Sequence, residues 1–495
     1  MTLGEVFRLL LPEAILLITG VVVLCVDLVW RDDEKKTHWI PGLALIGLGL
    51  AMAATILLWG TTPTTVLAMM AVDPFALFFK IVAIACVMLV ILAAVPYLQG
   101  RTRYRGEFYS LLVFACLAIS LASSAINLIS VYLAMEFLSI TSYVLAGYLR
   151  DDKKSNEAGL KYFLYGAVAS AIMLYGMSLL YGATGTTDLA EIAQLLMAGG
   201  QSMYWLAVSA IVMMLAGFGF KIVLAPFHQW SPDTYEGAPT PVTAFLSVGS
   251  KAAGFAIMMR VFLTALADFR WGFGWMAFLI ALSIISMALG NLIALRQTNI
   301  KRMLAYSSIG HAGFIAIGFI CLATEVENAF LGMNGTLFYL FAYLFTNLAA
   351  FTAVIAVESY TGSAEIKDYR GMVKRAPVIA GVLLVALLSL AGIPGTGGFL
   401  SKFLVFGSAI QFKTPQTYSL AIVGIIASVI AAFYYLNVVR QMFFERADEG
   451  AEPIQVGRGL QVGLAVTAVA ILVVGLYPQP FIEFATKSMG MLGVF

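Results

Sequence analysis

Stretches of about 20 apolar residues recur along almost the whole chain and are separated by short polar segments. A helix of this length crosses the hydrocarbon core of a bilayer, where the backbone must satisfy its own hydrogen bonds. Only 11% of the residues are charged and 61% are hydrophobic, whereas soluble domains carry about 25% charge. The pattern therefore predicts an all-α, polytopic membrane protein.

Fourteen transmembrane helices are predicted from these stretches, and together they account for most of the chain. They cover residues 8–30, 39–60, 74–98, 108–124, 126–148, 158–183, 204–235, 241–265, 274–295, 302–322, 329–358, 377–411, 416–440 and 459–482. The segment 188–198 has apolar residues at helical spacing with acidic residues opposite. This segment is predicted to be a short helix on the membrane surface.

Basic residues define the predicted orientation, because Lys and Arg are retained in cytoplasmic loops. The odd-numbered loops hold nineteen of them, namely Arg31, Lys35, Lys36, Arg101, Arg103, Arg105, Arg150, Lys153, Lys154, Arg296, Lys301, Arg302, Lys367, Arg370, Lys374, Arg375, Arg440, Arg446 and Arg458. The even-numbered loops and the two tails hold only Arg270, Lys413, Arg8 and Lys487. A missed helix would invert every later loop, so the distribution supports the helix count and predicts that both termini are extracytoplasmic.

Two of the predicted helices are interrupted beside a lysine. The seventh contains Lys221 followed by Pro226, and proline removes one helical hydrogen bond. The twelfth contains one proline and four glycines between residues 392 and 398, shortly before Lys402. Each could be an ordinary kink, but paired breaks in two halves of a chain indicate inverted transporter repeats.

These features divide the chain into four predicted segments. An N-terminal three-helix segment (1–107) precedes a first five-helix repeat (108–265), a second, inverted five-helix repeat (274–445) and a C-terminal segment with helix 14 (446–495). Helices 7 and 12 are the broken helices of the two repeats.

Three ionisable residues near the middle of predicted helices are candidates for a proton pathway. A charge at this depth costs at least ~2.5 kcal/mol, so such residues usually serve ion movement. Glu136 lies in the fifth helix without a basic neighbour one turn away, and Lys221 and Lys251 are the natural cations to meet it. A lysine with a carboxylate nearby holds its proton, and without one the proton leaves easily. A purely structural ion pair is the alternative.

Lys402, His228 and His311 are further candidates. Lys402 is too far from either surface to reach it, so a proton-carrying role is predicted. The two histidines could connect the lysines through water, because imidazole both donates and accepts hydrogen bonds. Each could equally be a core residue with satisfied hydrogen bonds. By contrast, Glu13, Lys80 and Arg260 lie toward helix ends, from which their side chains could extend to the surface.

Three segments carry a resemblance to a known family. They are GFGFKIVLAPFHQW (217–230), SPDTYEGAPTPVTAFLSVGSK (231–251) and NIKRMLAYSSIGHAGF (299–314). The chain resembles, over nearly its whole length, the antiporter-like membrane subunits of proton-translocating NADH:quinone oxidoreductase (respiratory complex I), most closely the subunit N type. One departure is GIPGTGGFLSKF, where the family more often has a second proline, so the geometry of the second break can differ.

The resemblance implies roles for particular residues. Glu136 and Lys221 match the family's paired glutamate and lysine, Lys251 its central lysine, and Lys402 its twelfth-helix lysine, where the M type carries glutamate. No nucleotide-binding loop, iron–sulfur or haem pattern is present in the sequence. The resemblance therefore implies that NAD, FMN, iron–sulfur clusters and quinone bind to partner subunits. The partners also include further antiporter-like subunits. The implied location is a bacterial plasma (inner) membrane.

These observations give one hypothesis and two alternatives. In the hypothesis, a cytoplasmic half-channel reaches Lys251 and an extracytoplasmic half-channel leaves near Lys402, and redox events in partner subunits change the Glu136 to Lys221 separation. The first alternative is a cation/proton antiporter subunit of a multisubunit sodium exchanger. The second is a membrane-anchor subunit of a hydrogenase-like or photosynthetic relative that does not pump.

Overall fold

The computed structural model describes residues 2–30, 38–269, 274–321, 330–447, 453–454 and 457–489. The orientation-defining residues Arg31, Lys35, Lys36 and Arg270 lie outside the described residues. The N-terminal elements are α1 (Leu3–Leu9), α2 (Leu11–Trp30), α4 (Ile40–Leu57), β1 (Thr64–Val66), β2 (Met70–Val72) and α5 (Pro74–Leu98). The two short strands pair antiparallel between α4 and α5.

The remaining elements are almost entirely helical. Those up to residue 269 are α6 (Arg105–Ser124), α7 (Leu128–Ala146), α8 (Lys153–Thr184), α9 (Leu189–Ala198), α10 (Gly200–Ile222), α11 (Trp230–Gly237), α12 (Thr240–Phe245), η1 (Leu246–Ser250), α13 (Lys251–Thr264) and η2 (Ala267–Phe269). Those after it are α14 (Trp275–Ala294), α15 (Ile300–Ile320), α16 (Phe330–Thr361), η3 (Ile366–Tyr369), α17 (Met372–Arg375), α18 (Pro377–Ala391), α19 (Gly397–Gln411), α20 (Pro415–Phe444), α21 (Arg458–Leu476) and α22 (Gln479–Met489).

The helices account for the predicted membrane crossings. Within the described residues, 13 helical segments are long and apolar enough to cross a membrane, with α12, η1 and α13 counted as one. The remaining predicted crossing, residues 377–411, is divided by its break into α18 and α19. Each of these two helices has only 15 residues. The prediction of an all-α, polytopic membrane protein is therefore confirmed.

Both predicted helix breaks are present. α10 ends at Ile222, Val223 takes a left-handed conformation (φ 67°), and α11 begins only at Trp230. The Trp230 indole donates to the carbonyl of Phe220 (3.1 Å), and the Ser286 hydroxyl accepts from the backbone N–H of Ala225 (2.8 Å). Neighbouring side chains thus satisfy backbone groups that the broken helix leaves free, as irregular backbone at membrane depth requires.

The second break depends on glycine. α18 ends at Ala391, and Gly392 and Gly395 both have φ of 88°, which L side chains rarely adopt. α19 begins at Gly397, and Lys402 lies on its second turn. The glycines that replace the family's second proline therefore preserve the interruption.

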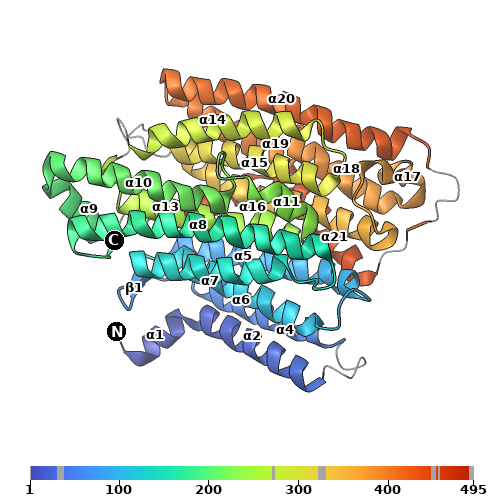
Figure 1. Ribbon diagram of the computed structural model, residues 1–495, viewed down its shortest axis with the longest axis horizontal. Helices are drawn as coiled ribbons and strands as arrows, with labels where there is room; N and C mark the ends of the chain where they lie inside the picture. Colours follow the sequence, from blue (N-terminus) through green and yellow to red (C-terminus); the bar gives the residue numbers. More distant parts are fainter. Residues whose placement is uncertain are drawn as a thin grey trace.

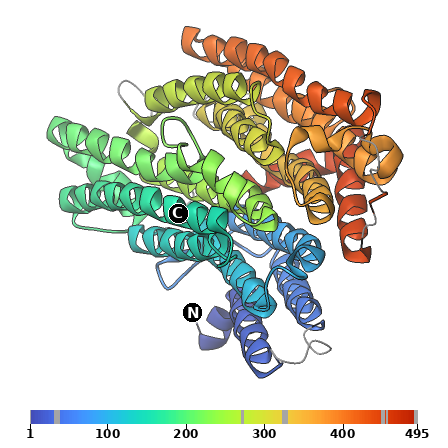
Figure 2. The same cartoon turned by 45° about the vertical axis from the view of Figure 1, so that its right-hand side comes forward.

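The helices form one bundle, and three of its most buried membrane crossings lie in the interior. In Figures 1 and 2, α20 and α14 lie on one side of the bundle, α2 and α4 lie on the opposite side, and α13, α15 and α16 lie between them. The α12–α13 crossing is buried over its whole length, and α15 and α16 nearly so, whereas α8 and α20 expose apolar side chains. The candidate charges on α13, α15 and α19 are therefore enclosed by protein.

The connections alternate between the two ends of the bundle. The β1–β2 hairpin and α9 lie at one end, and α17 lies at the other, as Figure 1 shows. The predicted surface helix 188–198 is α9, and its apolar residues Leu189, Ile192 and Leu196 are buried, because α9 packs on α8, α10 and α13. These three residues therefore contact protein, whereas Leu195 and Met197 on the same helix are exposed.

Candidate functional site

Lys251 lies at the centre of the bundle, with 0% relative exposure. Its Nζ donates hydrogen bonds to the carbonyl oxygen of Ser308 on α15 (2.6 Å) and to the Ser308 hydroxyl. The Tyr343 ring on α16 lies 5.3 Å from Nζ, and the Tyr343 hydroxyl donates to Ser308 Oγ (3.3 Å). Within the described residues no carboxylate pairs with Lys251, so only neutral groups stabilise its proton.

Lys402 lies on α19, and its ammonium group sits at the C-terminal end of α18. Its Nζ donates to the carbonyls of Leu390 (2.9 Å) and Ala391 (3.0 Å), which are the last two residues of α18. A helix C-terminus carries unsatisfied carbonyls and a partial negative charge. The break therefore supplies Lys402 with a fixed, weak counter-charge in place of a carboxylate.

His311 lies on α15 between these two lysines. Its Nδ1 bonds the Tyr339 hydroxyl (2.7 Å), and its Nε2 lies 3.3 Å from the Tyr435 hydroxyl, which also bonds Ser307 Oγ (2.5 Å). The charges of Lys402 and Lys251 both act on the imidazole. Its position is therefore the one predicted for a bridging group, although its role remains a prediction.

Glu136 and Lys221 are neighbours without a direct ion pair. The Lys221 Nζ donates to Ser139 Oγ (3.1 Å), one turn beyond Glu136 on α7, and the Glu136 carboxylate accepts from the Ser170 hydroxyl on α8. The Glu136 charge nevertheless acts on Lys221. Gly254 makes room for Lys221 against α13, since a Cβ there would lie 3.2 Å from its side chain. Glu136 and Lys221 therefore lie near each other, but each side chain hydrogen-bonds a serine, and within the described residues the two charges form no direct ion pair.

His228 is not joined to this group. It lies in the break between α10 and α11 and is partly exposed. Its Nδ1 is buried without a hydrogen-bond partner, and no interaction links it to a lysine in the part of the chain that the structure describes. Of the two predicted histidine bridges, only His311 contacts the groups around the lysines.

A seam of polar contacts that was not predicted runs between the α12–α13 crossing and α16. Three pairs of side chains join the two helices along it: Thr240 with Glu358, Ser247 with Asn347, and Lys251 with Tyr343. We call these six residues the polar seam. The turn before Lys251, η1, is a π-helix, and such turns are frequent at functional sites. The seam leads from Lys251 toward the end of the bundle that carries the arginine-rich loops.

Glu358 closes the seam at that end. Its carboxylate accepts hydrogen bonds from Tyr97 (3.1 Å) and Thr240, and lies 3.7 Å from Arg101 and 4.0 Å from Lys301. The sequence indicates only that Arg101 and Lys301 lie in predicted cytoplasmic loops, and it does not indicate their contact with Glu358. Glu358 falls near the end of an apolar stretch, where acidic residues normally face the surface. The i, i+7, i+11 spacing of polar residues from Thr240 to Lys251 is the signal that could have indicated the seam.

Glu13, Lys80 and Arg260 do not use the access to the surface that their places near helix ends could give them, because all three are buried. Lys80 is fully buried and lies 2.6 Å from the Glu13 carboxylate. Arg260 is buried with its guanidinium against the Asp73 carboxylate at 2.5 and 3.0 Å. Although burial disfavours the Asp73 carboxylate, Arg260 outweighs this effect and holds the pKa of Asp73 below its usual range. Because neighbouring helices enclose these positions, the charged side chains pair with each other inside the protein and do not extend to water.

The arrangement is suited to proton transfer. Lysine, imidazole and hydroxyl groups converge on α13, α15, α16 and α19, and each can donate or pass on a proton. Within the described residues, no group of three or more His, Cys, Asp or Glu is arranged to hold a metal ion.

Comparisons with known proteins identify relatives of this chain. A family model described as NADH:quinone oxidoreductase/Mrp antiporter, TM, matches residues 125–431. NADH-quinone oxidoreductase subunit N of Moorella thermoacetica is 40% identical over 487 residues, covering 97% of this chain and 98% of the relative. NAD(P)H-quinone oxidoreductase subunit 2 of Thermosynechococcus vestitus is 42% identical over 493 residues, covering 97% of this chain and 92% of the relative.

A solved structure supports the same assignment. A chain of respiratory complex I from Thermus thermophilus with bound Aureothin superposes with a TM-score of 0.79 at 31% identity, covering 96% of this chain and 99% of that chain. The family model spans more than half of the sequence, and the relatives align over nearly all of it. The chain therefore belongs to the family of membrane subunits shared by NADH:quinone oxidoreductases and Mrp antiporters.

Proposed function

We propose that the chain is a proton-translocating, antiporter-like subunit of a redox-driven NADH:quinone oxidoreductase, of the subunit N type. The observation that carries this function is the buried row of proton-carrying groups from Glu358 through Lys251 and His311 to Lys402. The relatives at 40% and 42% identity carry names of quinone oxidoreductase subunits, which supports the same function. The redox chemistry takes place on other subunits.

Two half-channels meet on this row. The polar seam provides uptake from the cytoplasmic end to Lys251, and Lys402 delivers protons to the extracytoplasmic side. Between them, Ser308, Tyr435 and His311 supply hydrogen-bonding groups along α15 and α20. The seam ends at Glu358, beside Arg101 in the loop that the basic-residue pattern predicts to be cytoplasmic.

The Glu136 and Lys221 pair couples the row to partner subunits. Two unit charges 4 Å apart attract by about 4 kcal/mol at an effective dielectric constant of ~20, and doubling the distance halves this energy. Moving one charge against ~100 mV costs ~2.3 kcal/mol. Opening or closing this pair by a few ångströms therefore changes the energy by about the amount that one proton requires.

The assembly follows from the same function. Partner subunits carry the NAD, FMN, iron–sulfur and quinone sites, and further antiporter-like subunits lie alongside in a bacterial plasma membrane. Both termini face the extracytoplasmic side. Purification through a tag on this chain tests the assignment, because it should recover a peripheral arm with flavin and iron–sulfur clusters. Recovery of exchanger subunits alone, with sodium-dependent flux in vesicles that lack NADH and quinone, would establish the antiporter alternative instead.

Substituting Glu136 with Gln tests the coupling step. Gln keeps a partner for Ser170 but removes the charge that acts on Lys221, so redox-driven acidification should fall about fivefold to tenfold. Proton uptake by vesicles during NADH oxidation measures this. Glu191→Gln is the matched control, because Glu191 is exposed and accepts from the Thr186 hydroxyl. Pumping by Glu136→Gln at the level of the control would contradict the coupling role.

The two histidines provide a second test. His311→Gln retains hydrogen-bonding capacity near Tyr339 and Tyr435 but cannot carry a proton, so pumping should fall about tenfold or more. His228→Gln should leave pumping within about twofold, because His228 contacts none of these groups. Proton-to-electron ratios of the two variants in the same vesicles check this. Equal losses in both would refute the path through His311.

A further inference from the structure

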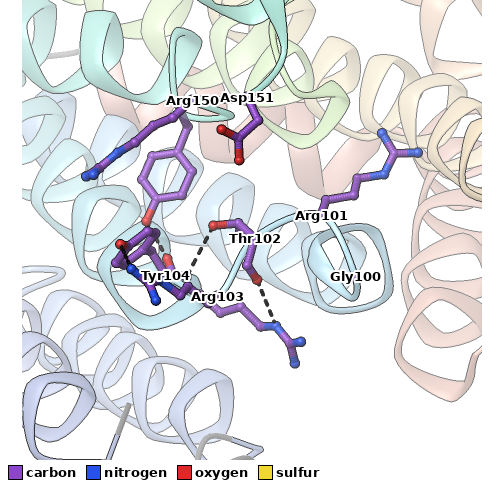
Figure 3. A pocket seen from close by; sticks show the side chains of 9 residues that line it. Gly100, Arg101, Thr102, Arg103, Tyr104, Arg150 and Asp151 are labelled. Carbon is purple, nitrogen blue, oxygen red and sulfur yellow. Dashed lines mark hydrogen bonds between the residues drawn. The ribbon is translucent and has the colours of Figure 1, made fainter. Parts of the chain in front are cut away.

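A basic pocket lies at the arginine-rich end of the bundle. It has a volume of about 600 Å³ and is lined by the loop between α5 and α6 and the loop between α7 and α8. Figure 3 shows Arg103, Tyr104, Arg150 and Asp151 around the pocket, with the Arg101 side chain extending away from them. Arg105 also lines it. The proton pathway proposed above does not use these residues, except for Arg101.

Most of the positive charge in this pocket lacks a counter-charge. Arg101 is occupied by Glu358 (3.7 Å). Arg103 and Arg150 each hold the guanidinium 4.8 Å from the centre of the Tyr104 ring, so both are fixed against one side chain. Within the described residues, none of Arg103, Arg105 and Arg150 forms an ion pair with a carboxylate, and Asp151 is the one acidic residue that lines the pocket. An anion bound here would relieve the repulsion among the arginines.

The donor set indicates which anion fits. Guanidinium groups present planar pairs of N–H donors that match the oxygens of a phosphate group. The pocket lies at the ends of transmembrane helices on the predicted cytoplasmic side, where basic pockets between helices bind the headgroups of anionic lipids. A phosphate group is therefore the expected ligand chemistry.

The surface next to the pocket favours a lipid over free phosphate. Ile129, Leu133, Ile140 and Val144 on α7 are each between 46% and 61% exposed. They recur at helical spacing, and Val144 precedes Tyr148, a lining residue of the pocket, by about one turn. This apolar stripe runs from the pocket along the membrane-facing side of α7, where acyl chains can lie.

We propose that this pocket binds the phosphate headgroup of an anionic phospholipid through Arg103, Arg105 and Arg150, with the acyl chains along α7. A lipid held here contacts the α5–α6 loop, which contains Arg101, and so it borders the Glu358 end of the polar seam. The site is independent of the pumping function, because its residues carry no protons.

Photo-crosslinking of the intact, detergent-purified complex tests the site. The complex is stripped of lipid and titrated with a phosphatidylglycerol that carries a diazirine, and labelled peptides are identified by mass spectrometry. Labelling should fall on residues 100–105 and 140–151. Unlabelled phosphatidylglycerol should compete, whereas phosphatidylcholine and millimolar inorganic phosphate should not. Competition by inorganic phosphate would identify a soluble phosphate site, and equal competition by phosphatidylcholine would exclude headgroup recognition, so either result overturns the proposal.

A matched pair of variants tests the arginines. Arg103→Gln/Arg150→Gln should weaken labelling by roughly 30-fold in apparent affinity, the change expected when two arginines near an anionic headgroup are lost. Arg446→Gln/Arg458→Gln removes the same charge from other predicted cytoplasmic loops and should label like the parent complex. Unchanged labelling in the first variant, or a partner subunit crosslinked over the pocket in place of lipid, would refute the site. The competition results decide the question even if the first variant does not assemble.

Discussion

Replacing Lys251 with Met should abolish redox-driven proton translocation. Lys251 is fully buried, and among the described residues its Nζ contacts Ser308 and the Tyr343 ring and pairs with no carboxylate, so its loss removes the one lysine between the described seam and His311. Met fills a similar volume but carries no proton. The proton-transfer step should slow by about 10²-fold or more, as when a positioned acid–base group is removed.

The measurement separates pumping from electron transfer. Vesicle acidification during NADH oxidation should fall to background, and quinone reduction should fall with it where the two are tightly coupled. NADH oxidation with an artificial acceptor should remain near the parent rate, because that reaction takes place on partner subunits. Lys374→Met removes an exposed lysine and serves as the control. An unchanged proton-to-electron ratio in Lys251→Met would disprove the pathway and favour the membrane-anchor alternative.

The helix count and both breaks could be predicted from the sequence because their causes are local. Apolar stretches of sufficient length must become membrane helices. Proline after Lys221, and glycines between residues 392 and 398, interrupt a helix wherever it lies. The structure places α10, α11, α18 and α19 on either side of these interruptions.

The partners of the charges could not be predicted, since they depend on how helices pack. Ser308, Tyr343 and Tyr435 are ordinary residues in sequence and become important only because α15, α16 and α20 place them beside Lys251 and His311. The same holds for the two buried ion pairs near helix ends, Lys80 with Glu13 and Arg260 with Asp73. A lysine or arginine near a helix end usually reaches the surface, and only an enclosing neighbour prevents it.

The Arg260 and Asp73 pair leads to the prediction with the largest effect on stability. The guanidinium binds Asp73 through two hydrogen bonds, donates to the Ser123 carbonyl (3.0 Å) and lies 4.7 Å from the centre of the Phe75 ring. Arg260→Met leaves the Asp73 carboxylate buried without its main counter-charge. Breaking one side of a buried pair in this way costs about 3–5 kcal/mol, so the variant should be strongly depleted from the assembled complex and unfold at a lower temperature.

The double variant Asp73→Asn/Arg260→Met distinguishes the lost pair from lost packing. Asn keeps the side-chain oxygen that caps α5 at the Ala76 N–H and removes the isolated charge. Since replacing both members of a buried pair by neutral groups is often nearly neutral, assembly and thermal stability should recover most of the loss. If the double variant were as unstable as Arg260→Met alone, the contacts of Arg260 with Ser123 and Phe75 would account for the stability.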